Sequence, residues 1–154
     1  MNIAIGCDEA AYELKELILL HLSEQSQVET QVKDFGTFSS QPVDYPDVAE
    51  EVANAIVRGE CERGILLCGT GLGMAIAANK VPGIRAATWH DVYSAERAQK
   101  SNNAQILTLG ARVIGPELAK KVVSAWLESN FTGGGSTRKV EKICRIEKKY
   151  SSET

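Results

Sequence analysis

An apolar run that ends in a cysteine and leads directly into alternating glycines is the feature that most constrains this chain. The segment reads ILLCGTGLGM and covers residues 65–74. A short apolar run closed by glycines predicts a buried parallel strand, and the alanine-rich segment behind it predicts a helix. The glycines then form a strand-to-helix turn, whose backbone N–H groups can hold an anion. Cys68 stands at the edge of that turn.

The rest of the chain alternates short apolar runs with segments of helical periodicity. The runs predict five strands, at residues 2–6, 30–35, 64–68, 84–88 and 105–109. The periodic segments predict helices at residues 12–20, 47–57, 72–79, 93–100, 116–129 and 137–149. Strands that alternate with helices indicate βαβ units, and hence an α/β fold with a five-stranded parallel sheet covered on both faces.

Length and composition narrow the class of protein. The 154 residues suit one domain, 1–154, and the hydrophobic and charged fractions of 44% and 24% are ordinary for a globular protein. A net charge of −3 predicts no general attraction to nucleic acid or to anionic membranes. We find no leader and no apolar stretch near the roughly 20 residues of a membrane span, so we expect a cytoplasmic location. The four cysteines form no C-x-x-C pair, so neither a metal site nor a redox motif is predicted.

In open parallel sheets, ligands bind beyond the carboxyl ends of the strands. This rule selects the residues from which the site is expected to be assembled. They are 6–9, 35–37, 68–73, 89–91 and 110–112.

Each candidate also has a purely structural interpretation. The spacing Gly69-x-Gly71-x-Gly73 fits neither the dinucleotide fingerprint nor a phosphate-binding P-loop, so the turn could serve only to pack a helix on a strand. Cys68 could be a small buried hydrophobe, or a thiolate stabilised at a helix start and suited to take a proton. Asp8 could be a helix N-cap or a partner for a substrate hydroxyl.

Seven segments, in order over almost the whole chain, resemble type B ribose-5-phosphate isomerase and the related galactose-6-phosphate isomerase subunits. They are IGCD (5–8), DFGT (34–37), DYP (44–46), CGTGLG (68–73), AANKVPGIRA (77–86), YSA (93–95) and GARVIG (110–115). The resemblance implies a Rossmann-like three-layer αβα sandwich. It also implies a homodimer with active sites at the interface, and leaves open whether dimers pair into tetramers.

The activity implied by the resemblance is the interconversion of aldose and ketose phosphates through an enediolate, with no metal and no cofactor. Cys68 would be the base that moves the proton, and Asn102 a further donor to the oxyanion. The turn would hold that oxyanion, with Thr70 counted as catalytic and Gly69, Gly71, Leu72 and Gly73 as substrate-binding. The expected substrate contacts are Asp8 and Tyr45 with hydroxyls and Arg112 with phosphate.

The sequence departs from this family at the two ends of the substrate. Glu9 replaces a histidine that usually follows the aspartate. Ser101 replaces the histidine that opens the sugar ring. Gly135 replaces a phosphate-binding arginine, and four residues on Lys139, with Arg138 beside it, replaces another. The proton-transfer residues are therefore kept, while the ring-opening and phosphate ends are altered.

Two explanations of these departures are open. In the first, His90 supplies the missing acid or base, and Arg112, Arg138 and Lys139 rebuild the phosphate site of a ribose 5-phosphate isomerase; the structural alternative for His90 is an exposed loop residue.

In the second, the substrate is a tetrose phosphate, such as erythrose or erythrulose 4-phosphate, which cannot close a furanose ring and needs no ring-opening histidine. Glu9 would then accept a hydroxyl and repel phosphate, which implies a shifted or reversed substrate. A non-catalytic sugar-phosphate binding protein is a third hypothesis.

Overall fold

The computed structural model describes residues 1–25 and 29–151, so residues 26–28 and 152–154 of the predicted domain lie outside the described part. Five strands form one parallel sheet in the order β2-β1-β3-β5-β4. Their bounds are β1 Asn2–Cys7, β2 Gln31–Asp34, β3 Arg63–Cys68, β4 Ala86–Thr88 and β5 Ile106–Gly110. The predicted parallel five-stranded sheet is confirmed.

The three central strands are apolar because both faces of the sheet are covered. Every residue of β3 and β5 is buried, and so is every residue of β1 except Asn2. In register, Cys7 lies opposite Leu67, and Cys68 lies opposite Gly110. The carboxyl ends of β1, β3 and β5 therefore meet at one edge of the sheet, where the sequence predicted the site.

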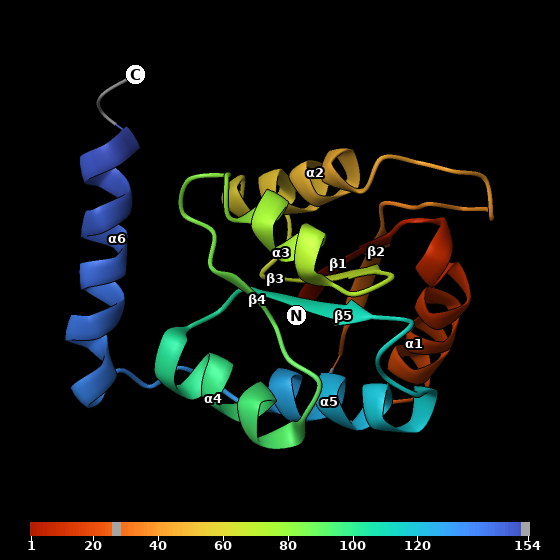
Figure 1. Cartoon of the computed structure of the whole chain (residues 1–154). Helices are drawn as coiled ribbons and strands as arrows, with labels where there is room; N and C mark the ends of the chain where they lie inside the picture. Colours follow the sequence, from red (N-terminus) through yellow and green to blue (C-terminus); the bar gives the residue numbers. More distant parts are fainter. Residues whose placement is uncertain (26–28, 152–154) are drawn as a thin grey trace.

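The described residues form six helices, of which five flank the sheet. Their bounds are α1 Tyr12–Glu24, α2 Tyr45–Val57, α3 Leu72–Ala78, α4 Val92–Asn102, α5 Pro116–Glu128 and α6 Thr137–Ser151. Helices α2 and α3 cover one face and α1, α4 and α5 the other, while α6 stands apart from the body (Figure 1). This arrangement confirms the three-layer αβα sandwich. None of the helices in residues 1–25 and 29–151 has the length and apolar character needed to cross a membrane.

Two apolar cores hold the layers together. On the side of α1, α4 and α5, Ile18 and Trp126 pack with Leu107 of β5, and the ring of Trp126 meets that of Trp89 edge to face at 6.0 Å. On the side of α2 and α3, Val52 and Met74 belong to the other core. The stripe of apolar residues on each helix thus selects which face of the sheet it covers.

The predicted elements appear in the predicted order, with differences at their ends. Helix α1 continues to Glu24, beyond the predicted end at residue 20. Strand β4 begins at Ala86 instead of residue 84, because the Arg85 amide donates to the Gln105 side chain instead of a neighbouring strand. Two short 3₁₀ helices, Glu9–Ala11 (η1) and Gly134–Ser136 (η2), were not predicted.

Candidate active site

Cys68 closes β3, and the turn that follows aims a backbone amide at its sulfur. The Gly71 N–H donates to Cys68 Sγ at 3.1 Å, and the Cys68 side chain is buried. Gly71 has a φ of 80°, and a Cβ there would lie 2.9 Å from the backbone of Leu109. Only glycine allows this approach without strain. The turn therefore places a backbone hydrogen-bond donor on the Cys68 sulfur.

The other two glycines of the turn let large side chains pack on it. A Cβ at Gly69 would lie 3.2 Å from Arg112 Nη1, and a Cβ at Gly73 would lie 2.6 Å from the ring of Tyr45. The guanidinium and the phenol therefore contact the turn where any larger residue would displace them. A cation and a hydroxyl group thus stand against the turn that follows Cys68.

Thr70 shapes the same turn from the exposed side. Its Oγ1 accepts a hydrogen bond from the Leu72 amide at 3.3 Å, while the Leu72 side chain is 58% exposed. The amide of Gly73 follows in the first turn of α3, where backbone N–H groups lack partners within the helix. These contacts keep the predicted anion cradle open to solvent on one side.

Asp8 follows β1 at the same edge and serves as a cap. Its Oδ1 accepts the Ala10 amide at 3.1 Å, which confirms the N-cap interpretation. Partial burial raises the pKa of the Asp8 carboxyl, and the charge of Glu9 raises it further. The charge of Arg112 acts in the opposite direction.

Glu9 holds a loop in place. Its Oε2 accepts the Val43 amide at 3.1 Å, and this hydrogen bond lowers the pKa of the Glu9 carboxyl. Val43 lies two residues before Tyr45, the first residue of α2. Glu9 therefore fixes the segment that carries Tyr45 to the turn.

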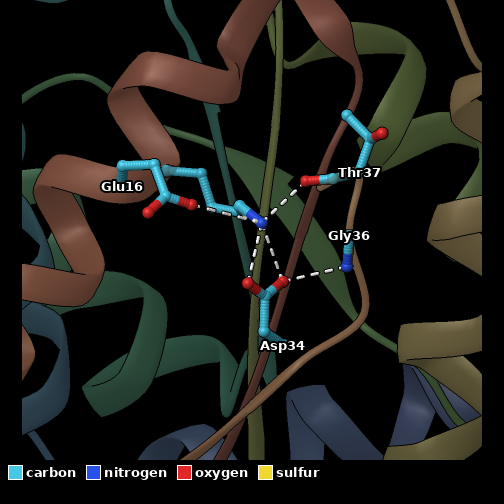
Figure 2. A network of polar contacts seen from close by, with 5 residues as sticks. Glu16, Asp34, Gly36 and Thr37 are labelled. Atoms are coloured by element: carbon cyan, nitrogen blue, oxygen red, sulfur yellow. Dashed lines mark hydrogen bonds and ion pairs between the residues drawn. The ribbon is translucent and has the colours of Figure 1, made fainter. Parts of the chain in front are cut away.

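A fully buried lysine that was not predicted from the sequence stabilises the loop beside this edge of the sheet. Lys15 Nζ donates to both carboxylate oxygens of Asp34, at 2.9 and 2.7 Å, and to the carbonyl of Thr37 at 2.7 Å. Figure 2 shows the same Asp34 carboxylate accepting the Gly36 amide. Gly36 and Thr37 in turn exchange backbone hydrogen bonds with Cys7, the residue before Asp8. The position of Lys15 on the buried face of α1, between Leu14 and Ile18, was the available signal.

His90, at the end of β4, is half-buried and engaged, so it is not an exposed loop residue. Its Nε2 accepts the amide of Gly110 at 2.9 Å, and burial lowers the pKa of the imidazole. Because Gly110 is the register partner of Cys68, His90, two residues beyond β4, lies at the same edge of the sheet. The nitrogen bound to Gly110 is not available to a substrate in this arrangement.

Ser101 and Asn102 lie at the opposite edge of the sheet in the same chain. They end α4, and the Asn102 carbonyl accepts a hydrogen bond from Arg85, immediately before β4. The four steps from the start of β5 to Gly110 separate the two edges by ~13 Å. Within one chain, therefore, these two residues do not reach Cys68.

Arg138 and Lys139 open α6, which follows η2, and η2 packs against α4. They belong to the same end of the molecule as Ser101 and Asn102 (Figure 1). Within one chain, Arg138 and Lys139 therefore lie with α4 and not with the turn that follows Cys68. No cluster of three or more His, Cys, Asp or Glu placed to hold a metal occurs in the described ranges.

The fold and the residues around the Cys68 turn define a class of protein. It is an α/β protein with a cysteine, a backbone-amide cradle and a nearby cation at the carboxyl edge of its sheet. The chain belongs to the Ribose/Galactose Isomerase family, whose sequence model matches residues 3–143.

Close relatives carry two different names. Ribose-5-P isomerase B of Listeria innocua is 52% identical over 97% of this chain and 99% of its own. D-erythrulose-4-phosphate isomerase of Pectobacterium atrosepticum is 57% identical over 93% of both chains. The solved structure of Clostridium thermocellum ribose-5-phosphate isomerase B has a TM-score of 0.93 and 49% identity, covering 97% of this chain and 99% of that one.

Proposed function

We propose that this protein interconverts the aldose and ketose forms of a small sugar phosphate, with ribose 5-phosphate and ribulose 5-phosphate as the first candidate pair. The observation that carries the proposal is the hydrogen bond from the Gly71 amide to Cys68 Sγ, beside Arg112. A base next to an anion-holding cradle is what proton transfer at a carbon beside a carbonyl requires. The Listeria and Clostridium relatives support ribose 5-phosphate.

In the proposed reaction, the Cys68 thiolate removes the proton from C2 of the aldose. The C–H electron pair forms the C1–C2 double bond, and the carbonyl oxygen becomes an oxyanion held by the amides of the turn. The proton then passes from sulfur to C1, while the hydroxyl proton of O2 moves to O1, which gives the ketose. Asp8 and Tyr45 bind substrate hydroxyls, and Arg112 binds the phosphate of the five-carbon substrate.

A tetrose 4-phosphate is the second candidate substrate, and Ser101 is the observation that favours it. A four-carbon sugar phosphate carries its phosphate on O4, so it cannot close a furanose ring and needs no ring-opening acid or base. His90, whose Nε2 is bound to the Gly110 amide, is poorly placed to replace a histidine at position 101. The Pectobacterium relative supports the same candidate.

The proposal includes a homodimer in which each active site draws on both subunits. One chain carries Cys68 and Ser101–Asn102 at opposite edges of its sheet. Exposed apolar side chains on α6, Ile146 and Tyr150, and on α3, Ile76, provide surface for such an interface. Asn102, Arg138 and Lys139 of one subunit would then complete the Cys68 site of the other.

A substrate panel tests the activity. The purified protein is incubated with ribose 5-phosphate and erythrulose 4-phosphate in deuterated water, and solvent deuterium in the sugar is measured. We expect incorporation into at least one sugar, and its absence from four-, five- and six-carbon sugar phosphates alike would leave only the binding-protein hypothesis. Equal turnover of ribose 5-phosphate and the tetrose phosphate would contradict the argument from Ser101.

Subunit mixing tests the shared site. Cys68→Ala and Asn102→Ala variants, each inactive or weak, are unfolded together and refolded as a mixture. Random pairing makes half of the dimers mixed, and each mixed dimer has one intact site, so about a quarter of wild-type activity returns. No recovery in a mixture that contains mixed dimers, verified by differently sized tags, would show that Asn102 acts within its own chain.

A further inference from the structure

Arg97 lies on α4, one helical turn before Ser101, and its guanidinium is fixed by that serine. Arg97 Nε and Nη2 donate to Ser101 Oγ at 3.0 and 2.7 Å. A guanidinium has five N–H donors in a rigid plane. Two of them are occupied, so the edge formed by Nη1 and the second hydrogen of Nη2 is left for a ligand.

This cation has no carboxylate within ion-pair distance among residues 1–25 and 29–151. The neighbouring cation of the same helix differs, because Lys100 pairs with Glu96 at 3.3 Å. Arg97 is also exposed. It is therefore a positioned and unneutralised charge whose free edge has the geometry that binds phosphate oxygens in pairs.

Arg97 and Asn102 face one cavity of about 540 Å³ that runs along β4. The acidic residue of its lining, Asp91, is occupied by the amide of Ser94, which donates to Asp91 Oδ1 at 2.7 Å. The cavity thus offers the amide side chain of Asn102 and the cation of Arg97 to a ligand. The acidic group in its lining, Asp91, is already hydrogen-bonded to the Ser94 amide. A small polar anion matches this lining.

The geometry points to Arg97 as a specificity-determining residue that binds the phosphate of a four-carbon sugar phosphate. This inference rests on the proposed function, in which Asn102 of one subunit stands at the reacting carbons in the other. Arg97 is hydrogen-bonded to Ser101, the residue before Asn102, so its charge lies close to the reacting end of the substrate.

The number of carbons in the sugar decides which substrate fits the short distance between the Arg97 charge and the reacting carbons. In a tetrose 4-phosphate, O4 carries the phosphate. In a pentose 5-phosphate the phosphate is one carbon further away, and O4 is the ring oxygen. A titrating group near O4 serves ring opening, whereas a guanidinium remains charged at every physiological pH and is suited to hold phosphate. Arg97 and Ser101 together therefore favour the acyclic, shorter substrate.

The test compares Arg97→Leu with Arg97→Lys and with Lys100→Met, a matched control that removes a paired cation from the same helix. KM and kcat are measured for erythrulose 4-phosphate and ribose 5-phosphate, together with competitive inhibition by inorganic phosphate. For Arg97→Leu we expect KM for the tetrose phosphate and the inhibition constant of phosphate to rise about 10- to 100-fold, as for loss of charged hydrogen bonds. The kcat should change less than about threefold, Arg97→Lys should recover part of the loss, and Lys100→Met should resemble wild type.

The outcomes separate the two proposals. An unchanged KM and phosphate inhibition in Arg97→Leu, or an equal rise for both sugars, would overturn the role of Arg97. If the wild-type protein exchanges no deuterium into any sugar phosphate, the proposed function fails. Equilibrium binding of inorganic phosphate to wild type and Arg97→Leu then still tests Arg97: tenfold weaker binding supports the anion site, and equal binding refutes it.

Discussion

The two edges of the sheet are organised differently. At the carboxyl edge, Cys68, Asp8, Tyr45 and Arg112 converge on one glycine turn through backbone and side-chain contacts within a single chain. At the amino edge, the end of α4 carries Ser101 and Asn102, and Arg85 donates a hydrogen bond to the Asn102 carbonyl.

The difference also appears in the cations of the two edges. Lys15 is fully buried and bound by Asp34, and it maintains the architecture of the carboxyl edge. Arg97 is exposed, and within residues 1–25 and 29–151 its hydrogen-bond partner is the neutral hydroxyl of Ser101. A charge that has a buried partner supports the fold, whereas a fixed charge without one is suited to a ligand. Under the two proposals, the chemical step and the choice of substrate therefore fall on separate parts of the chain.

The largest expected effect concerns the proton-transfer residue. Cys68→Ala should lower kcat for isomerisation about 10³-fold, within the range that general bases contribute. Solvent deuterium incorporation and kcat measure the loss. Cys61→Ala is the matched control, because Cys61 is a buried cysteine just before the other end of β3, and it should stay near wild type. Activity of Cys68→Ala within tenfold of wild type would exclude Cys68 as the base.

A smaller effect is expected when the amide donor on Cys68 is displaced. Gly71→Ala forces a Cβ against the Leu109 backbone and moves the turn, so kcat should fall about 100-fold, as for loss of one oxyanion donor. Gly59→Ala is the control, because Gly59 also has a positive φ, of 74°, but no atom within 4 Å of the new Cβ.

Both substitutions carry the left-handed backbone cost of about 1–2 kcal/mol. Urea unfolding should therefore show a stability loss in both variants, while kcat should fall only in Gly71→Ala. A kcat loss of the same size in Gly59→Ala would mean that global stability, not the turn, controls turnover.

The smallest expected effect is on pH dependence. The pKa of Asp8 is raised, first by burial and then by the charge of Glu9. As pH falls through that raised pKa, Asp8 gains a proton and loses its ability to accept a substrate hydroxyl as an anion. We expect KM to rise about tenfold on the acid side, the scale of one charged hydrogen bond.

Glu9→Gln sharpens the same measurement. It removes the neighbouring charge that raises the pKa of Asp8 and keeps an oxygen to accept the Val43 amide. The rise in KM should therefore shift to lower pH in Glu9→Gln and flatten in Asp8→Asn. A profile that is identical in all three proteins would show that Asp8 does not bind the substrate.

Local patterns in the sequence were sufficient to predict the five strands and six helices and their order along the chain. The reason is that apolar periodicity reflects which face each element buries. The Cys68–Gly73 turn was predictable for the same reason, since its residues are contiguous. Lys15 of α1 was not identified as a buried group, because its partner Asp34 comes from strand β2 and periodicity alone does not pair charges.

The sequence by itself determined the parallel αβα architecture, the glycine turn beside Cys68 and the family resemblance, since each of these depends on neighbours along the chain. Only the tertiary structure decided that Tyr45 and Arg112 pack on the turn, that His90 is bound to the Gly110 amide, and that Ser101 and Asn102 lie at the other edge. The physical reason is that a parallel sheet gathers the carboxyl ends of its strands at one edge and sends the end of each crossover helix to the other.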